Sequence, residues 1–225
     1  MLNVFVGGSG VNDDFITGYL KGLDMPLANY WGANTNDFKT IHINKYGVPS
    51  FTDFKSGCKN AKIVFAENKY LETDIEDMAF ALENAIQLFM DYAGRDQINI
   101  YGHSNGGNII TRWLETYKPN YVHNILTVAT PYNGKSVSVT PTGFLKEAIA
   151  NKDKISYSGQ VDMIVARLDN QQSYPSNIPS DGVVAYDSAQ CGTLIYGNRM
   201  SVVDGYNHNT AQASPLVSNL ISKWF

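Results

Sequence analysis

The chain has 225 residues, 44% of them hydrophobic and 17% charged, with a formal net charge of −4. This length and composition suit one hydrophobic core, so we expect a single domain over residues 1–225. No run of Lys or Arg is present, which argues against a surface for nucleic acid or an anionic membrane. No apolar run reaches the length of a membrane span, so we expect no integral membrane association. A small-molecule partner fits these features best.

Cys58 and Cys191 lie far apart and lack the spacing to other Cys or His residues that is typical of a metal site. We therefore expect two free thiols, with one long-range disulfide as the alternative. The first residues, MLNVFVGGSG, have neither the basic start nor the long apolar segment of a signal peptide. This favours a cytoplasmic location, with a secreted mature form as the alternative, and the sequence leaves the oligomeric state open.

Seven short apolar runs rich in Val and Ile predict β-strands, because they are too short for helices and are bounded by Gly, Asn or Pro. The runs cover residues 2–6, 40–44, 62–67, 97–102, 124–130, 154–159 and 200–205.

Three longer segments carry apolar residues at helical spacing, at 74–94, 109–117 and 216–224. The first has acidic residues in its first turn and Gly94 past its last turn, as expected for a helix. Strands and helices thus alternate along the chain. This alternation predicts an α/β fold, in which a mostly parallel sheet is covered by helices on both faces.

Two regions are less regular than the rest, residues 20–60 and residues 131–153. In open α/β sheets, ligands bind beyond the carboxyl ends of the strands, where such segments collect. We therefore expect both regions to wall a binding site. The second region contains one short apolar helix pattern at 144–150, which is too small for a large lid.

The segment INIYGHSNGGNII, residues 98–110, places Ser104 between a predicted strand and a predicted helix. Gly102 and Gly106 lie two residues to either side of the serine, in the pattern GxSxG. A serine that projects its oxygen from a tight strand-to-helix turn needs small residues at these positions, which is the nucleophile elbow. The alternative is an ordinary Gly- and Ser-containing loop, but the flanking strand and helix favour the elbow.

A nucleophilic serine requires a base and an orienting acid. Of the four histidines, His42 precedes the serine, His103 lies within the elbow, and His123 comes before another strand can present an acid. His208 remains, in a loop after the last predicted strand. We therefore expect His208 to be the base.

Several aspartates between Ser104 and His208 are candidates for the acid, and Asp162 and Asp181 are favoured. Asp162 follows the predicted strand at 154–159, and Asp181 precedes a turn glycine in PSDGVVAYDSA. Both positions suit a loop at the carboxyl end of the sheet. The residues alone leave both open, and each could instead be a solvated or turn-capping Asp. The remaining candidates are Asp153, Asp169, Asp187 and Asp204.

Five segments, VFVGGSG, GHSNGG, VATPYNG, SDGVV and a late NH, resemble the α/β-hydrolase lipases and esterases, particularly compact bacterial lipases. The resemblance covers nearly the whole chain. It implies that Asp181 is the acid and His208 the base of a triad with Ser104. It also implies that the backbone N–H groups of Ser9 and Asn105 form the oxyanion hole.

The sequence departs from these relatives at two places. Gly7-Gly8 stands where the family commonly has His-Gly, which loosens the assignment of Ser9. Asn209 and Thr210 stand where some relatives hold calcium with an Asp, so we expect no metal, and no cofactor is implied. The resemblance implies a carboxylic ester hydrolase acting on a small-molecule ester or a lipid.

Two other functions compete with the hydrolase. The segment ATPYNGKS, residues 129–136, is similar to the phosphate-binding pattern GxxxxGK[ST]. A helix should then follow directly, but VSVTPTG is β-branched and contains proline, which disfavours a nucleotide-binding protein. The second alternative is a non-catalytic binding protein with the same fold.

Overall fold

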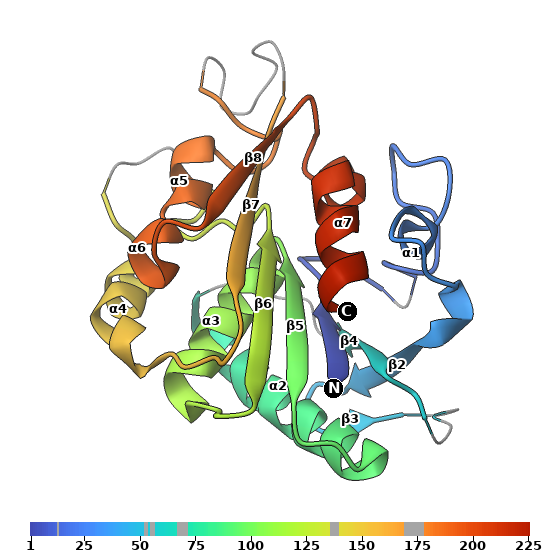
Figure 1. Cartoon of the computed structure of the whole chain (residues 1–225). Coiled ribbons are helices and arrows are strands. Elements are labelled where there is room, and N and C mark those ends of the chain that lie inside the picture. Colours follow the sequence, from blue (N-terminus) through green and yellow to red (C-terminus); the bar gives the residue numbers. More distant parts are fainter. Residues whose placement is uncertain (13, 52–53, 55–56, 67–71, 136–139, 169–177) are drawn as a thin grey trace.

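The computed structural model describes residues 1–225 except 13, 52–53, 55–56, 67–71, 136–139 and 169–177. In the described residues, eight strands form one sheet in the order β3-β2-β4-β1-β5-β6-β7-β8 (Figure 1). Neighbouring strands are parallel except β3, which pairs antiparallel with β2. The mostly parallel sheet of an α/β fold is thus confirmed. The strands are β1 Leu2–Val6, β2 Phe38–Ile43, β3 Pro49–Ser50, β4 Asn60–Phe65, β5 Ile98–His103, β6 Val122–Val128, β7 Val161–Arg167 and β8 Met200–Asp204.

One predicted strand is wrong, and the true strand lies next to it. Residues 154–159 form no strand, whereas β7 begins at Val161. Ser158 and Gly159 donate backbone hydrogen bonds to carbonyl oxygens of Val122 and His123, at the start of β6. The segment is therefore the connection that enters the sheet at its amino end, and the more apolar run after it forms the buried strand. The other six predicted strands overlap β1, β2, β4, β5, β6 and β8.

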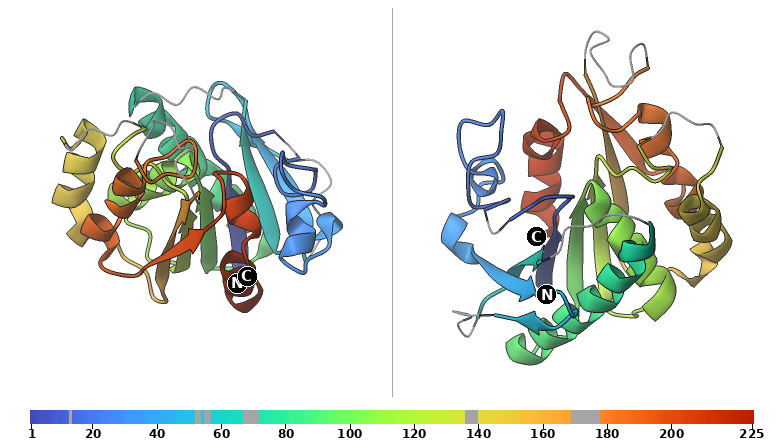
Figure 2. Two further views of the ribbon diagram at one scale, coloured as in Figure 1. Left: turned by 90° about the horizontal axis from the view of Figure 1, so that it is seen from above. Right: turned by 180° about the vertical axis from the view of Figure 1, so that it is seen from behind.

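Helices cover both faces of the sheet, as expected (Figure 2). Val4 and Val6 of β1 pack in one buried cluster with α2 and α3, while Phe5 points to the other face and packs with α1 and α7. Among the described residues, no helix is long and apolar enough to cross a membrane. The α-helices are α1 Leu27–Tyr30, α2 Glu72–Ala93, α3 Asn105–Tyr117, α4 Gly143–Asn151, α5 Tyr186–Gln190, α6 Thr193–Tyr196 and α7 Pro215–Trp224, and the 3-10 turns are η1 Thr35–Asp37, η2 Lys152–Lys154 and η3 Thr210–Ala213.

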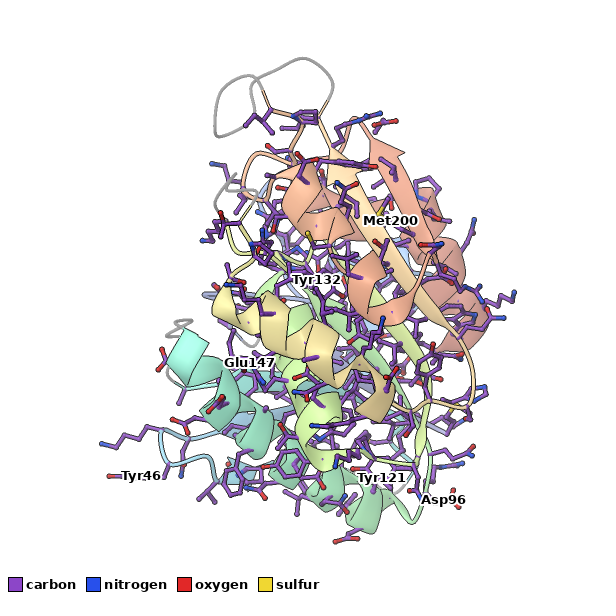
Figure 3. All side chains as sticks on the ribbon, turned by 90° about the vertical axis from the view of Figure 1, so that its left-hand side faces the viewer. Tyr46, Asp96, Tyr121, Tyr132, Glu147 and Met200 are labelled. Carbon is purple, nitrogen blue, oxygen red and sulfur yellow. The ribbon has the colours of Figure 1, made fainter. Side chains whose placement is uncertain are left out.

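Two tyrosines labelled in Figure 3, Tyr132 and Tyr46, differ in how far they are buried. Tyr132, in the loop after β6, is 1% exposed and its hydroxyl donates to Thr127 at 2.9 Å. Tyr46, in the turn between β2 and β3, is 75% exposed and projects from the body of the protein. The loop after β6 is therefore anchored in the core, which matters because it borders the site described below.

Four asparagines form a chain of side-chain hydrogen bonds across adjacent strands at the amino end of the sheet. Asn3 donates to Asn60 at 2.7 Å, Asn99 donates to Asn3 at 3.0 Å, and Asn124 donates to Asn99 at 3.1 Å. Asn3 and Asn99 also donate to the backbone carbonyl oxygens at 224–225, at the end of α7. The chain therefore joins the last helix to four strands, and three of its asparagines, Asn3, Asn99 and Asn124, are buried with partners.

We predict that Asn99→Ala lowers the free energy of unfolding by about 1–3 kcal/mol, because it leaves the buried acceptor on Asn3 and the half-buried carbonyl oxygen of Trp224 without a donor. Urea unfolding monitored by circular dichroism measures this loss. Asn198→Ala is the control, since Asn198 is exposed, and it should change the stability by less than about 0.5 kcal/mol. Equal stability of both variants would contradict a structural role for the asparagine chain.

Candidate active site

Ser104 occupies the turn between β5 and α3, with φ 53° and ψ −131°. A residue with a side chain seldom adopts a positive φ, and holding it there costs about 1–3 kcal/mol. Two backbone hydrogen bonds keep the turn in place. The Ser104 N–H donates to the Val128 carbonyl oxygen at 2.9 Å, and the Gly107 N–H donates to the Ser104 carbonyl oxygen at 3.0 Å. The strained residue is the one that the sequence predicts to be the nucleophile.

The glycines on either side of Ser104 lie where a side chain would collide with backbone. A Cβ atom at Gly106 would lie 2.3 Å from the carbonyl oxygen of Val6 in β1. A Cβ atom at Gly102 would lie 2.8 Å from the backbone nitrogen of Gly107. Because backbone atoms cannot rotate away, the sharp turn requires glycine at both positions.

Asp181 and His208, which lie 27 residues apart, meet beyond the carboxyl ends of β7 and β8. Asp181 Oδ2 lies 2.7 Å from His208 Nδ1, and the His208 N–H donates to the Asp181 carbonyl oxygen at 2.9 Å. The other carboxylate oxygen accepts from the N–H groups of Val183 and Val184 at 2.9 and 2.7 Å. The carboxylate is 2% exposed, so these bonds hold it rigidly. Nδ1 therefore carries a proton, and Nε2 of the neutral ring is left as an acceptor.

Ser104 and His208 line one small pocket of about 70 Å³. Among the described residues, the hydrogen bonds of His208 go to Asp181 and His103, and none joins it to Ser104. Such bonds are often long in free enzymes and tighten when substrate binds. The structure thus brings together the predicted nucleophile, base and acid at one end of the sheet.

Asp162, the other candidate for the acid, lies far from this position. It is the second residue of β7, so it is at the amino end of the sheet, and the expectation that it follows a strand is wrong. Its Oδ2 atom lies 3.7 Å from the Arg199 guanidinium. Burial raises the pKa of the Asp162 carboxyl, and Arg199 partly offsets this effect. The misplaced strand at 154–159 is the reason for the error.

Ser9 and Asn105, the predicted oxyanion-hole residues, lie side by side. Ser9 follows β1, Asn105 begins α3, and the Asn105 amide donates to the Ser9 hydroxyl at 2.9 Å. The Asn105 N–H belongs to the first turn of the helix, where N–H groups have no acceptor within the helix and attract negative charge.

His103 contacts His208, a relation that the sequence analysis did not predict. Its Nε2 lies 2.9 Å from the His208 carbonyl oxygen, and the two ring centroids are 4.8 Å apart. Burial, together with the neighbouring His208, lowers the pKa of His103 to about 3. His103 therefore stays neutral and donates from Nε2. The position of His103 next to Ser104 was the one feature of the sequence that pointed to a place in the site.

A larger pocket, of about 270 Å³, adjoins Ser9 and Asn105. The irregular region at 131–153 contributes to its wall, as expected, and the predicted short helix there is α4. Of the region at 20–60, Leu20 reaches the smaller pocket beside Ser104. The larger pocket is lined by Ser9, Ile75, Asn105, Asn108, Pro131, Gly134, Lys135, Thr142 and Phe144.

A sequence profile of the alpha/beta hydrolase fold matches residues 27–176. The chain belongs to the alpha/beta hydrolase fold family. This confirms the family that the sequence resembles.

Solved structures agree with this alpha/beta hydrolase fold. The lin2722 gene product from Listeria innocua superposes with a TM-score of 0.77 at 19% identity, over 100% of this chain and 93% of that one. The mature Bacillus licheniformis lipase BlEst2 gives a TM-score of 0.61 at 14% identity, over 98% and 91% of the two chains. A comparison with curated proteins finds no match. At these identities the likeness concerns the fold alone.

The described part of this hydrolase contains no group of three or more His, Cys, Asp or Glu residues that could hold a metal ion. Cys58 and Cys191 are unpaired, as expected. In the phosphate-binding alternative, Ser136 lies outside the described residues, and the next described helix begins only at Gly143. Tyr132 and Asn133 of that segment are buried rather than exposed to a ligand. The described geometry thus offers little support for a nucleotide site.

We predict that His103 makes the stability of this hydrolase depend on pH. Its pKa is about 3 in the folded protein against an ordinary value of 6.5, so below pH 6.5 the unfolded state binds a proton that the folded state does not. The contribution of neutral His103 to the free energy of unfolding is therefore present above pH 6.5 and is lost as the pH falls. Between pH 7 and 5 this loss is about 2 kcal/mol.

Urea unfolding at the two pH values tests this contribution. His103→Gln should lose about 2 kcal/mol less than the wild type between pH 7 and 5, because glutamine does not titrate. His42→Gln, at an exposed position, is the control and should behave as the wild type. A wild-type response in His103→Gln would show that His103 accepts a proton in the folded state.

Proposed function

We propose that the protein is a serine hydrolase that cleaves carboxylic esters, as an esterase or small lipase, through an acyl-enzyme on Ser104. The observation that carries this proposal is the 2.7 Å hydrogen bond between Asp181 and His208, held beside the strained Ser104 turn. Membership of the alpha/beta hydrolase fold family supports a hydrolase. A neutral imidazole whose far nitrogen is free to accept a proton is what a serine nucleophile requires.

The first half-reaction uses Ser104, His208 and Asp181. The Ser104 Oγ attacks the ester carbonyl carbon while Nε2 of His208 accepts the hydroxyl proton. Asp181 keeps the proton on Nδ1 and stabilises the imidazolium that forms. The carbonyl π electrons move to the oxygen, which becomes the oxyanion of a tetrahedral intermediate. The intermediate then collapses, the bond to the alcohol breaks, and His208 gives its proton to the departing oxygen.

The oxyanion lies toward the N–H groups of Ser9 and Asn105, where the first turn of α3 stabilises negative charge. Removing one such donor in a serine protease costs about 10²–10³ in kcat. Water then attacks the carbonyl carbon of the acyl-enzyme while His208 accepts its proton. The second tetrahedral intermediate collapses, His208 returns the proton to the Ser104 oxygen, and the carboxylic acid product is released. The reaction as proposed uses no cofactor and no metal, and its partner is a small ester or lipid.

We predict that a fluorophosphonate labels the protein at Ser104 and that Ser104→Ala abolishes both labelling and ester turnover. Intact-mass measurement and peptide mapping locate the label, and release of p-nitrophenol from p-nitrophenyl butyrate reports turnover. Ser50→Ala is the matched control, because Ser50 is exposed at the far edge of the sheet. Labelling that persists in Ser104→Ala would remove the basis of the proposal and favour a non-catalytic member of the family.

We predict that Asp181→Asn and Asp162→Asn differ strongly in activity. An amide facing His208 Nδ1 favours the wrong tautomer, which costs about 10⁴ in kcat in the serine protease example. Asp181→Asn should therefore lose several orders of magnitude in kcat while it remains folded. Asp162→Asn should stay within about tenfold of the wild type, because Asp162 lies at the other end of the sheet. The reverse result would exclude Asp181 as the acid.

A further inference from the structure

Two neighbouring pockets adjoin the predicted oxyanion hole. The smaller contains Ser104 and His208, and the larger contains Asn105. Ser9 lines both pockets, so it marks the boundary between them. A substrate bound at Ser104 therefore has two different directions in which its groups can extend.

The chemistry of the proposed reaction decides which group takes which direction. The departing alcohol oxygen receives its proton from His208, so the alcohol must lie on the His208 side. The tetrahedral carbon has four substituents, of which the alcohol oxygen is one. The oxyanion, which points to the N–H groups of Ser9 and Asn105, is the second, and the Ser104 oxygen is the third. The remaining substituent of the tetrahedral carbon is the acyl chain. It must leave the centre away from His208, and His208 does not line the larger pocket.

The larger pocket has the size for a short chain, and part of its lining is apolar. Its volume of about 270 Å³ holds on the order of nine groups, at roughly 30 Å³ for each group of the size of water. Ile75, Pro131 and Phe144 provide apolar walls. The lining also contains polar groups: the Thr142 hydroxyl accepts from the Leu145 N–H, whereas the Asn108 Oδ1 atom is buried and has no hydrogen-bond partner among the described residues.

Phe144 is a fixed wall of this pocket. It lies in the first turn of α4 and is 5% exposed. The Arg112 guanidinium lies 5.4 Å from the centre of its ring, and Arg112 is itself held by Glu115 and Glu147 at 3.2 and 2.7 Å. A ring held in this way limits the length of chain that fits. Ile75, in the first turn of α2, is 5% exposed and forms another part of the wall.

We propose that this pocket binds the acyl group of the ester, and that Phe144 and Ile75 limit it to aliphatic chains of about four to eight carbons. The inference rests on the proposed function, because it uses the proton transfer from His208 to place the alcohol.

The test is a series of p-nitrophenyl esters from acetate to palmitate, measured as kcat/KM. The wild type should turn over butyrate to octanoate best and palmitate poorly. Phe144→Ala should raise the ratio of the dodecanoate to the butyrate rate constant by at least about tenfold, since one or two methylene groups are worth that much in an apolar pocket. Ile75→Phe should shift the preference toward acetate, and this variant keeps the test informative if Phe144→Ala does not fold.

Leu20→Ala is the matched variant, because Leu20 lines the pocket on the His208 side. It should leave the acyl-chain ratio within about twofold and change instead the preference among butyrate esters of different alcohols. The inference is overturned if Leu20→Ala shifts the acyl preference while Phe144→Ala and Ile75→Phe do not. Failure of the proposed function has a different signature, since no ester of any chain length would then be turned over in a manner that depends on Ser104.

Discussion

The structure of the site depends on the close approach of the first turn of α3 to the end of β1. A Cβ atom at Gly106 would lie 2.3 Å from the Val6 carbonyl oxygen, and one at Gly8 would lie 2.6 Å from the Ser104 Cβ atom. This contact brings the loop after β1 against the start of α3, and with it the N–H groups of Ser9 and Asn105. The Ser104 backbone must adopt an unfavourable φ to make the turn, and packing of the surrounding strands compensates for that cost. Strain at one residue is thus coupled to the arrangement of the whole carboxyl end of the sheet.

Three hydrogen bonds hold His208 in place, one to its ring, one to its backbone N–H and one to its backbone carbonyl oxygen. Asp181 binds both its ring and its backbone N–H, and His103 binds its backbone carbonyl oxygen. These residues come from the segments around β5, β7 and β8, so His208, the proposed base, is positioned by several strands of the sheet rather than by its own loop alone. Burial keeps His103 neutral, as its lowered pKa of about 3 indicates, and this spares a protonated His208 the repulsion of a second cation. Such preorganisation reduces the rearrangement needed when a substrate binds.

Local patterns were sufficient to predict most of the fold. Alternating strands and amphipathic helices, and Ser104 between glycines, follow from the period of apolar residues and from backbone sterics. The error at 154–159 arose because this short stretch precedes the Val- and Ile-rich β7 by only one residue, and choosing the earlier stretch as the strand misplaced Asp162. The contact of His103 with His208 depends on the pairing of distant strands, and so does the asparagine chain. Neither leaves a local signal, because the residues meet only when the register of the sheet is set.

The most direct test of a covalent acyl-enzyme is the partitioning of products between water and methanol. Phenyl, vinyl and p-nitrophenyl butyrate differ in the alcohol that leaves, but in the proposed mechanism all form the same butyryl-Ser104. The ratio of methyl butyrate to butyric acid, measured by chromatography at a fixed methanol concentration, should therefore be identical for the three esters, and Ser104→Ala should give neither product. A ratio that changes with the leaving alcohol would mean that the alcohol is still present when water attacks, and would contradict the acyl-enzyme on Ser104.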